Sequence, residues 1–354
     1  MKILHLYIIK TVILATLLVM AIVMGLSYFI SFLRELRDIG VGDYGIMQAA
    51  LHVLFELPHD LYQFFPMLVL LGGLAGLGLL ASHQELIVMR ISGMSISSMA
   101  QAVLGAAVVL TLLGLILGEF ISPHLHFLAD KHKSTAQSGG QAIATLSGVW
   151  IHEGNNFFHI DKVVAHHYLE GVTRYEFDQR HRLLAAYYAK TMDYQKGQWQ
   201  LTDVVKTNFI HDETTHQQMD KTVWDVALRP RFLNVGLHEP DEMPLPNLFE
   251  YTKHLEKNGL QAAEFQLNFW KRLFQPLTTL IMLLLAIPFV FAAPRSMTMG
   301  LRLLMGIIVG FVFYITSALI GQVSIVFQLS PFYAAVLPML IFAGMGYVLM
   351  LRIV

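Results

Sequence analysis

The chain has no cysteine and little charge. Without cysteine in its 354 residues, it has no disulfide scaffold, thiolate metal site or cysteine nucleophile. Only 14% of its residues are charged, against about 25% in ordinary globular proteins. The net charge of −1 offers no basic surface for nucleic acid. Gly-Lys, Gly-x-Ser-x-Gly and His-Glu-x-x-His are all absent, which excludes a P-loop nucleotidase, an α/β-hydrolase and a zinc protease.

Apolar sequence is abundant and unevenly distributed. Hydrophobic residues make up 55% of the chain, and the mean hydropathy is +0.55. Of the 24 basic and 25 acidic residues, 32 fall between residues 125 and 265. A single soluble domain is therefore excluded. We interpret residues 125–265 as a polar domain between two membrane-like segments, 1–124 and 266–354.

The membrane-like segments contain uncharged runs of the length that membrane helices need. A hydrocarbon core of about 30 Å requires about 20 apolar residues in a helix. Residues 303–351 carry no charge and are too many for one helix, so we place a break at Gln328–Pro331. The first run is longer than a signal peptide core, and we expect it to be retained. Six spans are predicted, at Thr11–Leu33, Leu61–Gln84, Ile91–Gly118, Leu273–Pro294 and on either side of that break.

Six spans place both termini on one side of the membrane, and the basic residues indicate which side. Short segments on the terminal side carry more of them than the short loops opposite, which we place at residues 34–60 and 325–330. The positive-inside rule therefore predicts cytoplasmic termini and a polar domain outside the cytoplasm. The residues compared are Lys2, Lys10, Arg90, Arg295, Arg302 and Arg352 on the terminal side, and Arg34 and Arg37 on the other.

The polar domain has the pattern of short strands separated by turns. Gly148–His152 and Phe157–Ile160 flank Glu153–Asn156 and predict a hairpin. This spacing favours an all-β domain and leaves an immunoglobulin-like sandwich, a jellyroll and a barrel open. Further strands are expected at 172–177, 183–194, 199–209 and 222–228, with 211–221 as a polar connection and 248–267 as a helical stretch.

The sequence groups no residues into a catalytic or metal site. Twelve of the 16 histidines lie between residues 124 and 254, scattered over predicted strands and loops. We interpret them as surface or structural residues and expect no metal and no cofactor. The span interiors lack the carboxylates that couple transport to protons. Energy for any transport would then come from a partner protein.

The link between the second and third spans, Ser82–Gly93, is short, charged and helical in its spacing. It is either an interfacial turn or a coupling helix, near residues 83–93, that docks onto a cytoplasmic ATPase. Its core, Gln84-Glu-Leu-Ile-Val-Met-Arg-Ile-Ser-Gly93, resembles the Glu-Leu-x-Val-Met-x-x-Ser-Gly signature of the LptF/LptG permease family. Agreement extends over nearly the whole chain, at Phe64–Met67, Leu71–Leu80, Gly154–Phe157, Phe269–Leu277, Arg295–Gly300 and Gly310–Tyr314.

The resemblance implies a membrane α-helical protein with six transmembrane helices, three plus three, and an inserted extracytoplasmic all-β, jellyroll-like domain. It implies a non-catalytic permease subunit in the inner membrane of a Gram-negative bacterium, with the β-domain in the periplasm. The expected partners are an LptF-like permease subunit, an LptB-like ATPase dimer and an LptC-like periplasmic partner. The expected substrate is lipopolysaccharide, extracted from the membrane and passed towards the outer membrane.

Three groups of residues are candidates for these roles. Basic residues outside the membrane suit an anionic head group, because arginine and lysine bind phosphate. Their alternative is solvated interfacial charge, with Arg34 or Arg37 paired to Glu35, Asp38 or Asp130. The groups are Glu85, Leu86, Met89 and Arg90 for ATPase coupling, Arg34, Arg37, Lys131 and Lys133 for the head group, and Phe64, Phe65, Phe311 and Tyr314 for an acyl cavity. The aromatic residues could equally face lipid or lie between helices.

Two further interpretations stay open. Gly72-x-x-x-Gly76 and Gly306-x-x-x-Gly310 predict close helix packing, either generic packing or a seam with a partner subunit. The chain could also be a membrane-anchored scaffold or assembly factor whose β-domain binds a protein without moving a substrate. A membrane-embedded lipid-modifying enzyme is disfavoured, because the sequence has no catalytic constellation.

Overall fold

The structure is a computed structural model, and the residues that it describes form six helices long and apolar enough to cross a membrane. This confirms the predicted spans. They are α1 (Lys2–Glu35), α3 (Phe65–Ser82), α5 (Ile96–Ile116), α9 (Ala263–Phe291), α10 (Met299–Val326) and α11 (Pro331–Leu351). The structure describes residues 2–137, 149–153, 155–165, 168–178, 182–195, 198–210, 213–224, 240–241, 243–257, 260–291 and 298–351. Gly148, Gly154, residues 225–228, residues 292–297 and Arg352, used above, lie outside that set.

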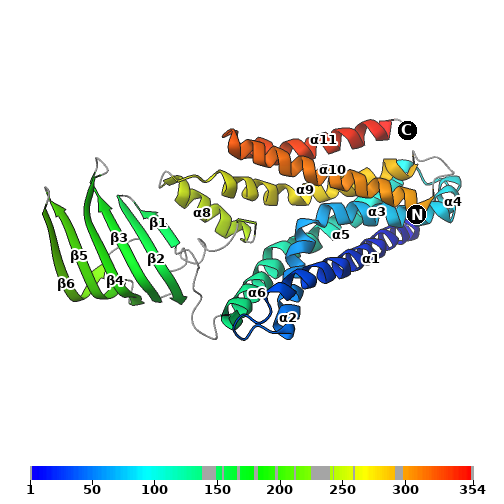
Figure 1. Ribbon diagram of the computed structural model, residues 1–354. Helices are drawn as coiled ribbons and strands as arrows, with labels where there is room; N and C mark the ends of the chain where they lie inside the picture. Colours follow the sequence, from blue (N-terminus) through cyan, green and yellow to red (C-terminus); the bar gives the residue numbers. More distant parts are fainter. Residues whose placement is uncertain are drawn as a thin grey trace.

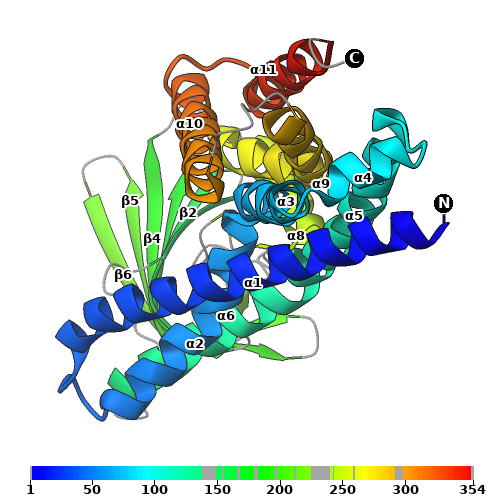
Figure 2. The same cartoon turned by 90° about the vertical axis from the view of Figure 1, so that its right-hand side faces the viewer.

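Helix α3 lies at the centre of the helical bundle. It is apolar on all sides, and 72% of its most apolar window is buried, against 11% for α10. A helix that is hydrophobic all round belongs in the interior. Figure 2 shows α3 surrounded by α1, α5, α9 and α10, and it contacts α1, α9 and α10 directly. Any displacement of α3 would therefore change its packing against most of the other helices in the bundle.

The two predicted glycine pairs allow close packing within the chain. Gly72 and Gly76 of α3 lie against α1, and Gly306 and Gly310 of α10 lie against α3. A Cβ atom added at Gly72 would come within 2.3 Å of the Thr16 Cα. The predicted close approach is thus confirmed, and small residues are the reason that the helix backbones can come so near.

Besides the short helix near residues 83–93 that was expected, the described residues form helices α2, α6 and α8 outside the predicted spans. The interpretation of residues 34–60 as a short loop was wrong, because α2 (Ile46–Gln63) occupies most of it. Helix α6 (Ser122–Gln137) continues α5 through η2 (Leu117–Ile121), so residues 125–137 are helical and the strands begin later. Helices α2 and α6 pack against each other. The expected helical stretch near 248–267 is present as α8 (Leu245–Lys257) and the start of α9.

The polar domain contains one antiparallel sheet in which consecutive strands are neighbours. The predicted hairpin is confirmed, with Val149 opposite Ile160. Residues 211–221 were wrongly interpreted as a connection, since most of them belong to β6, a mostly exposed strand that pairs with β5. Their threonines explain the strand, because β-branched residues fit a pleated edge. The strands are β1 (Val149–Glu153), β2 (Asn156–Ala165), β3 (Tyr168–Phe177), β4 (Leu183–Gln195), β5 (Gln198–Ile210) and β6 (Glu213–Trp224).

The sheet has a hydrophobic core separate from that of the helices. Phe158, Val172 and Trp199 are fully buried on one face of it, and Trp224 packs edge-on against Phe158. The bundle has its own buried cluster around α3. The inserted all-β domain is therefore confirmed as a unit with its own core, and the described strands form a single meander.

Candidate functional site

The helical bundle has two distinct ends, shown in Figure 1. One end carries α4 (Glu85–Ile91), the start of α1 and the end of α11, and we call it the α4 end. The opposite end carries α2 and α6 and faces the β-sheet, and we call it the sheet end. The candidate coupling residues lie at the α4 end, and the candidate head-group residues lie at the sheet end.

Local backbone geometry isolates α4 as a separate short helix. Gln84 has a left-handed conformation, with φ of 62°, at the junction with α3. Gly93, with φ of 87°, follows the last turn, where glycine carries no steric penalty. The Ser92 hydroxyl donates to the Val88 carbonyl oxygen and satisfies one of the final acceptors. The helix thus begins and ends within the linker between α3 and α5.

The two faces of α4 have different surroundings. Leu86 and Met89 are buried, with exposed fractions of 4% and 5%, and they pack into the bundle core. They are therefore not available as apolar contacts for another protein. The apolar surface that α4 does present comes from residues that the sequence interpretation did not single out, namely Ile87, Val88 and Ile91.

The charged candidates of α4 are accessible. Glu85 retains 33% of its side-chain exposure, and its carboxylate oxygen lies 3.8 Å from Nδ1 of His83. Arg90 is exposed in the last turn of the helix. An exposed apolar patch bounded by charges of both signs is typical of a protein-binding surface.

At the sheet end, the four candidate head-group residues have different environments. Arg37 and Lys131 are exposed, and exposed Arg34 donates a hydrogen bond of 2.8 Å to the Ser31 hydroxyl. Lys133 differs from these three, because its ammonium group is paired with the carboxylates of Glu35 and Asp38. The structure brings the three exposed residues to this end of the bundle without joining them into one pocket.

Lys133 joins α6 to the end of α1. Its Nζ lies 2.5 Å from Oε1 of Glu35 and 2.8 Å from Oδ2 of Asp38. The Tyr44 hydroxyl donates to the same Glu35 oxygen at 2.8 Å. Burial and the neighbouring Glu35 carboxylate raise the pKa of Tyr44 well above its usual range. This network neutralises Lys133 and gives it a structural contact of its own.

A second cluster lies deeper between α2 and α6. His52 Nε2 lies 3.2 Å from Oε1 of Glu56. Burial alone would lower the pKa of His52, but Glu56 and Glu35 together raise it. Burial would likewise raise the pKa of Glu56, yet His52 holds it below its usual range. Among the described residues, His52, Glu56 and Asp130 have the types and spacing that a metal ion needs.

The candidate acyl residues do not line one cavity. Phe65 is 3% exposed and packs against Gly114 of α5. The rings of Phe64 and Tyr314 lie 5.4 Å apart, which joins α10 to the segment between α2 and α3. Phe311 is 56% exposed on the outer surface of α10. Of the four, only Tyr314 borders the cavity described next.

A cavity of about 370 Å³ lies between α10, α9 and the junction of α2 with α3. Its lining is about equally polar and apolar, and it includes charged groups of both signs, from Lys271 and Arg272 of α9 and from Asp241. The amide of Gln275 at its edge donates a 2.7 Å hydrogen bond to the Tyr62 carbonyl oxygen. Such a cavity offers hydrogen-bonding groups to a polar head as well as apolar surface. Its uncharged polar residues include Gln63, Gln275, Tyr314, Ser317 and Gln322.

Beside this cavity lies an ion pair that the sequence interpretation missed. Arg272 in α9 is 5% exposed, and its Nε lies 2.8 Å from Oε1 of Glu119 in η2. Arg272 also donates to the carbonyl oxygens of Met243 and Gly118, and Glu119 accepts from the Leu245 amide. The sequence did contain a signal for this pair. Glu119 and Arg272 are an acidic and a basic residue, and each lies at the sheet-side end of a different apolar span.

Comparison with known proteins agrees with these features. The family model described as lipopolysaccharide export system permease LptF/LptG matches residues 6–352. LptG of Escherichia coli (strain K12) is 35% identical over 335 residues, which cover 94% of this chain and 93% of that protein. LptG of Haemophilus influenzae is 33% identical over 348 residues, covering 98% and 97%. With six membrane-capable helices, an inserted β-domain and a match over nearly its whole length, the chain belongs to the LptF/LptG family of lipopolysaccharide export permeases and is a multi-pass inner-membrane protein.

Proposed function

We propose that this chain is the membrane permease subunit of an ATP-driven transporter that extracts lipopolysaccharide from the inner membrane. The β-domain receives the substrate and belongs to a periplasmic jellyroll bridge towards the outer membrane. Full-length similarity to LptG proteins supports the proposal. ATP hydrolysis is assigned to a partner, since the sequence has no P-loop.

The proposed orientation places the α4 end in the cytoplasm and the sheet end in the periplasm. Lys2, Lys10 and Arg90 lie at the α4 end, and Arg302 lies in the first turn of α10. An excess of basic residues is typical of cytoplasmic segments. Both chain termini are then cytoplasmic, and the β-sheet is periplasmic.

The observation that carries the proposal is the two-sided environment of α4. Leu86 and Met89 hold its inner face in the bundle core, while Ile87, Val88 and Ile91 are exposed. A partner bound to the exposed face would transmit its movement to α3, which α4 contacts. We assign this surface to an LptB-like ATPase dimer. An LptF-like permease subunit and an LptC-like partner complete the assembly.

The substrate is proposed to bind at the periplasmic side of the bundle. Arg34, Arg37 and Lys131 are exposed there and can meet anionic phosphates on the lipopolysaccharide head. Lys133 is assigned to the same surface, with its charge shared by Glu35 and Asp38. Acyl chains gain little free energy on passing from a bilayer to an apolar cavity. The proposed acyl contacts Phe64, Phe65, Phe311 and Tyr314 therefore set shape more than affinity.

The test is replacement of Glu85 at the ATPase-facing surface. Truncating one partner of a desolvated charge pair costs about 2–5 kcal/mol. Glu85→Ala and Glu85→Lys should therefore weaken co-purification of the ATPase or uncouple ATP hydrolysis from lipopolysaccharide release. Glu264→Ala is the matched control, because Glu264 is an exposed acid in the first turn of α9, near the sheet end. Full assembly and full release by both Glu85 variants would reject the coupling role.

The same purification separates the permease from the scaffold alternative. A permease brings with it an ATPase, and membranes that contain the complex release lipopolysaccharide when ATP is added. A chain that purifies without any ATPase, and whose β-domain retains only a protein partner, would support the scaffold instead.

A further inference from the structure

Two histidine–carboxylate pairs face each other across the α2–α6 contact. His52 and Glu56 are four residues apart in α2, and His126 and Asp130 are four apart in α6. Residues four apart on a helix share a face. The helices run antiparallel. Asp43, just before α2, donates its backbone N–H to the Ala136 carbonyl oxygen near the end of α6, whereas the ring of His59, near the end of α2, lies 5.3 Å from that of His126 near the start of α6. The two pairs therefore meet side by side.

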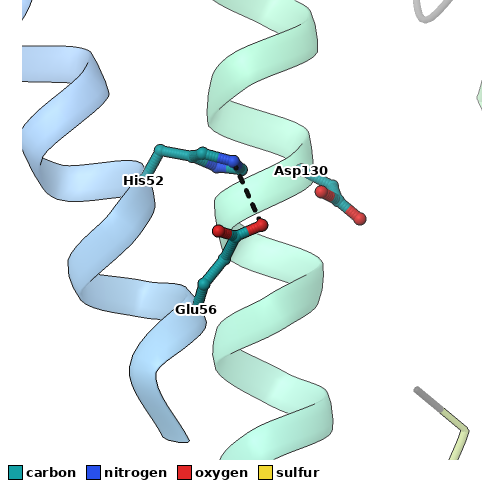
Figure 3. A group of neighbouring side chains, drawn as sticks. All are labelled: His52, Glu56 and Asp130. Carbon is teal, nitrogen blue, oxygen red and sulfur yellow. Dashed lines mark ion pairs between the residues drawn. The ribbon is translucent and has the colours of Figure 1, made fainter. Parts of the chain in front are cut away.

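The distances between their polar atoms are short. His52 Nε2 lies 3.2 Å from Glu56, and His126 Nε2 lies 3.4 Å from Asp130. One ligand atom each from His52, Glu56 and Asp130 lie within 4.8 Å of one another. Figure 3 shows His52 and Glu56 paired on one helix and Asp130 on the neighbouring helix. Three ligands from two helices thus converge on one small volume.

Carboxylates are concentrated around this volume. Glu56 and Asp130 belong to the cluster, and Glu35 lies 3.8 Å from His52 Nε2. Lys133, on the same helix as Asp130, is held by Glu35 and Asp38. A protonated histidine or a bound cation would offset the negative charge of the cluster. His52 is 4% exposed, whereas Glu56 and Asp130 keep 33% and 47% of their side-chain exposure, so an ion can reach the site from solvent.

If His52 and Glu56 form only an ion pair, one buried nitrogen of the cluster has no hydrogen-bond partner among the described residues. His52 is 4% exposed, and its Nδ1 is buried without a hydrogen-bond partner among the described residues. Buried polar atoms in native structures nearly always have a partner. His52 therefore offers a second nitrogen, besides the one that faces Glu56, that the described residues leave without a hydrogen-bond partner.

We propose that His52, Glu56 and Asp130 bind a divalent transition-metal ion, with Zn²⁺ as the best fit, and that the ion holds α2 against α6. Imidazole and carboxylate ligands suit Zn²⁺. Metal–ligand distances of about 2.0–2.2 Å place neighbouring ligands about 3.3 Å apart, and His52 and Glu56 already have this spacing. Asp130 completes the set by a side-chain movement. His126, whose Nε2 lies 3.4 Å from Asp130, is the residue placed to supply a fourth ligand.

The metal site is independent of the transport function proposed above. Its direct effect is on the helix pair at the sheet end, where the Lys133 network joins α6 to α1. A bound ion would fix the position of α2 relative to α6. Metal binding is therefore tested on the purified chain, without any transport measurement.

The experiment uses the full-length chain, purified in detergent, treated with EDTA and dialysed. Zn²⁺ is titrated at pH 8, where protons compete least for imidazole, and Co²⁺ is used as a spectroscopic probe because tetrahedral Co²⁺ absorbs strongly. The variants are His52→Gln and Asp130→Asn. Asp130 is 47% exposed, so its replacement perturbs folding least. His216→Gln is the control, because this exposed histidine lies in β6.

The expected result is one tight Zn²⁺ equivalent per chain, a tetrahedral Co²⁺ spectrum and a higher thermal unfolding temperature with Zn²⁺ than with EDTA. Losing a ligand should weaken binding by at least about 100-fold and abolish the Zn²⁺-dependent stabilisation, while His216→Gln retains both. Equal Zn²⁺ binding by the parent chain and both ligand variants would overturn the proposal. So would an unfolding temperature that is the same in Zn²⁺ and in EDTA, which would leave His52 and Glu56 as an ion pair.

Discussion

The Arg272 guanidinium in α9 binds the Glu119 carboxylate in η2 at 2.8 Å, across 153 residues of sequence. The pair joins the third predicted span to the fourth, on either side of the inserted β-domain. Arg272 also donates to carbonyl oxygens of the returning segment 241–243. The contact therefore fixes the point at which the chain re-enters the helical bundle.

We expect Arg272→Met to lower the free energy of unfolding by about 3–5 kcal/mol, because it leaves Glu119 partly buried without its counter-ion. Thermal or denaturant unfolding in detergent measures this change. The double variant Arg272→Met/Glu119→Leu should recover part of the loss, since no charge is then left alone. A single variant as stable as the parent would contradict the structural role of the pair.

The two faces of α4 should respond differently to substitution. Leu86→Ala removes a buried side chain and should cost about 2–5 kcal/mol of stability. Val88→Asp lies on the exposed face and should change stability by no more than about 0.5 kcal/mol, yet it should reduce co-purification of the ATPase. Unfolding curves and affinity purification measure the two effects. Normal ATPase recovery with Val88→Asp would remove this face from the proposed interface.

At the sheet end, the reversal of exposed charge should separate binding from folding. Arg34→Glu/Arg37→Glu should leave the unfolding temperature nearly unchanged and reduce photo-crosslinking of lipopolysaccharide and growth complementation. If charge alone matters, lysines at both positions should restore function. Undiminished crosslinking with normal growth would end the assignment of these two residues to substrate capture.

Lys133→Met should act on stability, in contrast to the arginine variants. Glu35, with 12% side-chain exposure, would lose its counter-ion, and the contact between α6 and α1 would weaken. We expect a lower unfolding temperature, measured in detergent without substrate. If Lys133→Met reduces crosslinking but not stability, its role in head-group binding outweighs its role in the network.

Gly72→Ala should be strongly destabilising for a change of one methyl group. The added Cβ would meet backbone and side-chain atoms of Thr16 at 2.2–2.5 Å, and overpacking of this kind costs about 1–3 kcal/mol or more. Gly344→Ala is the matched control, because no atom lies within 4 Å of its added Cβ. Alanine there should be neutral or stabilising, by up to about 1 kcal/mol. Equal unfolding temperatures for the two variants would contradict the close α1–α3 approach.

The sequence by itself determined the membrane helices, the inserted β-domain, the first hairpin and the family. These features are local, because apolar run length, strand alternation and a motif such as Glu85–Gly93 are readable without knowing what packs on them. It failed for α2, whose apolar face needs α6 as a partner, and for β6, where polar side chains on an exposed strand resemble a connection.

Contacts between distant segments were decided only by the tertiary structure. It placed Leu86 and Met89 inside the bundle, bound Lys133 to Glu35, paired Arg272 with Glu119, and brought His52 and Glu56 to Asp130. Each of these depends on which face of one helix meets which face of another. Side-chain spacing defines a face, whereas its partner follows from the packing of the whole bundle.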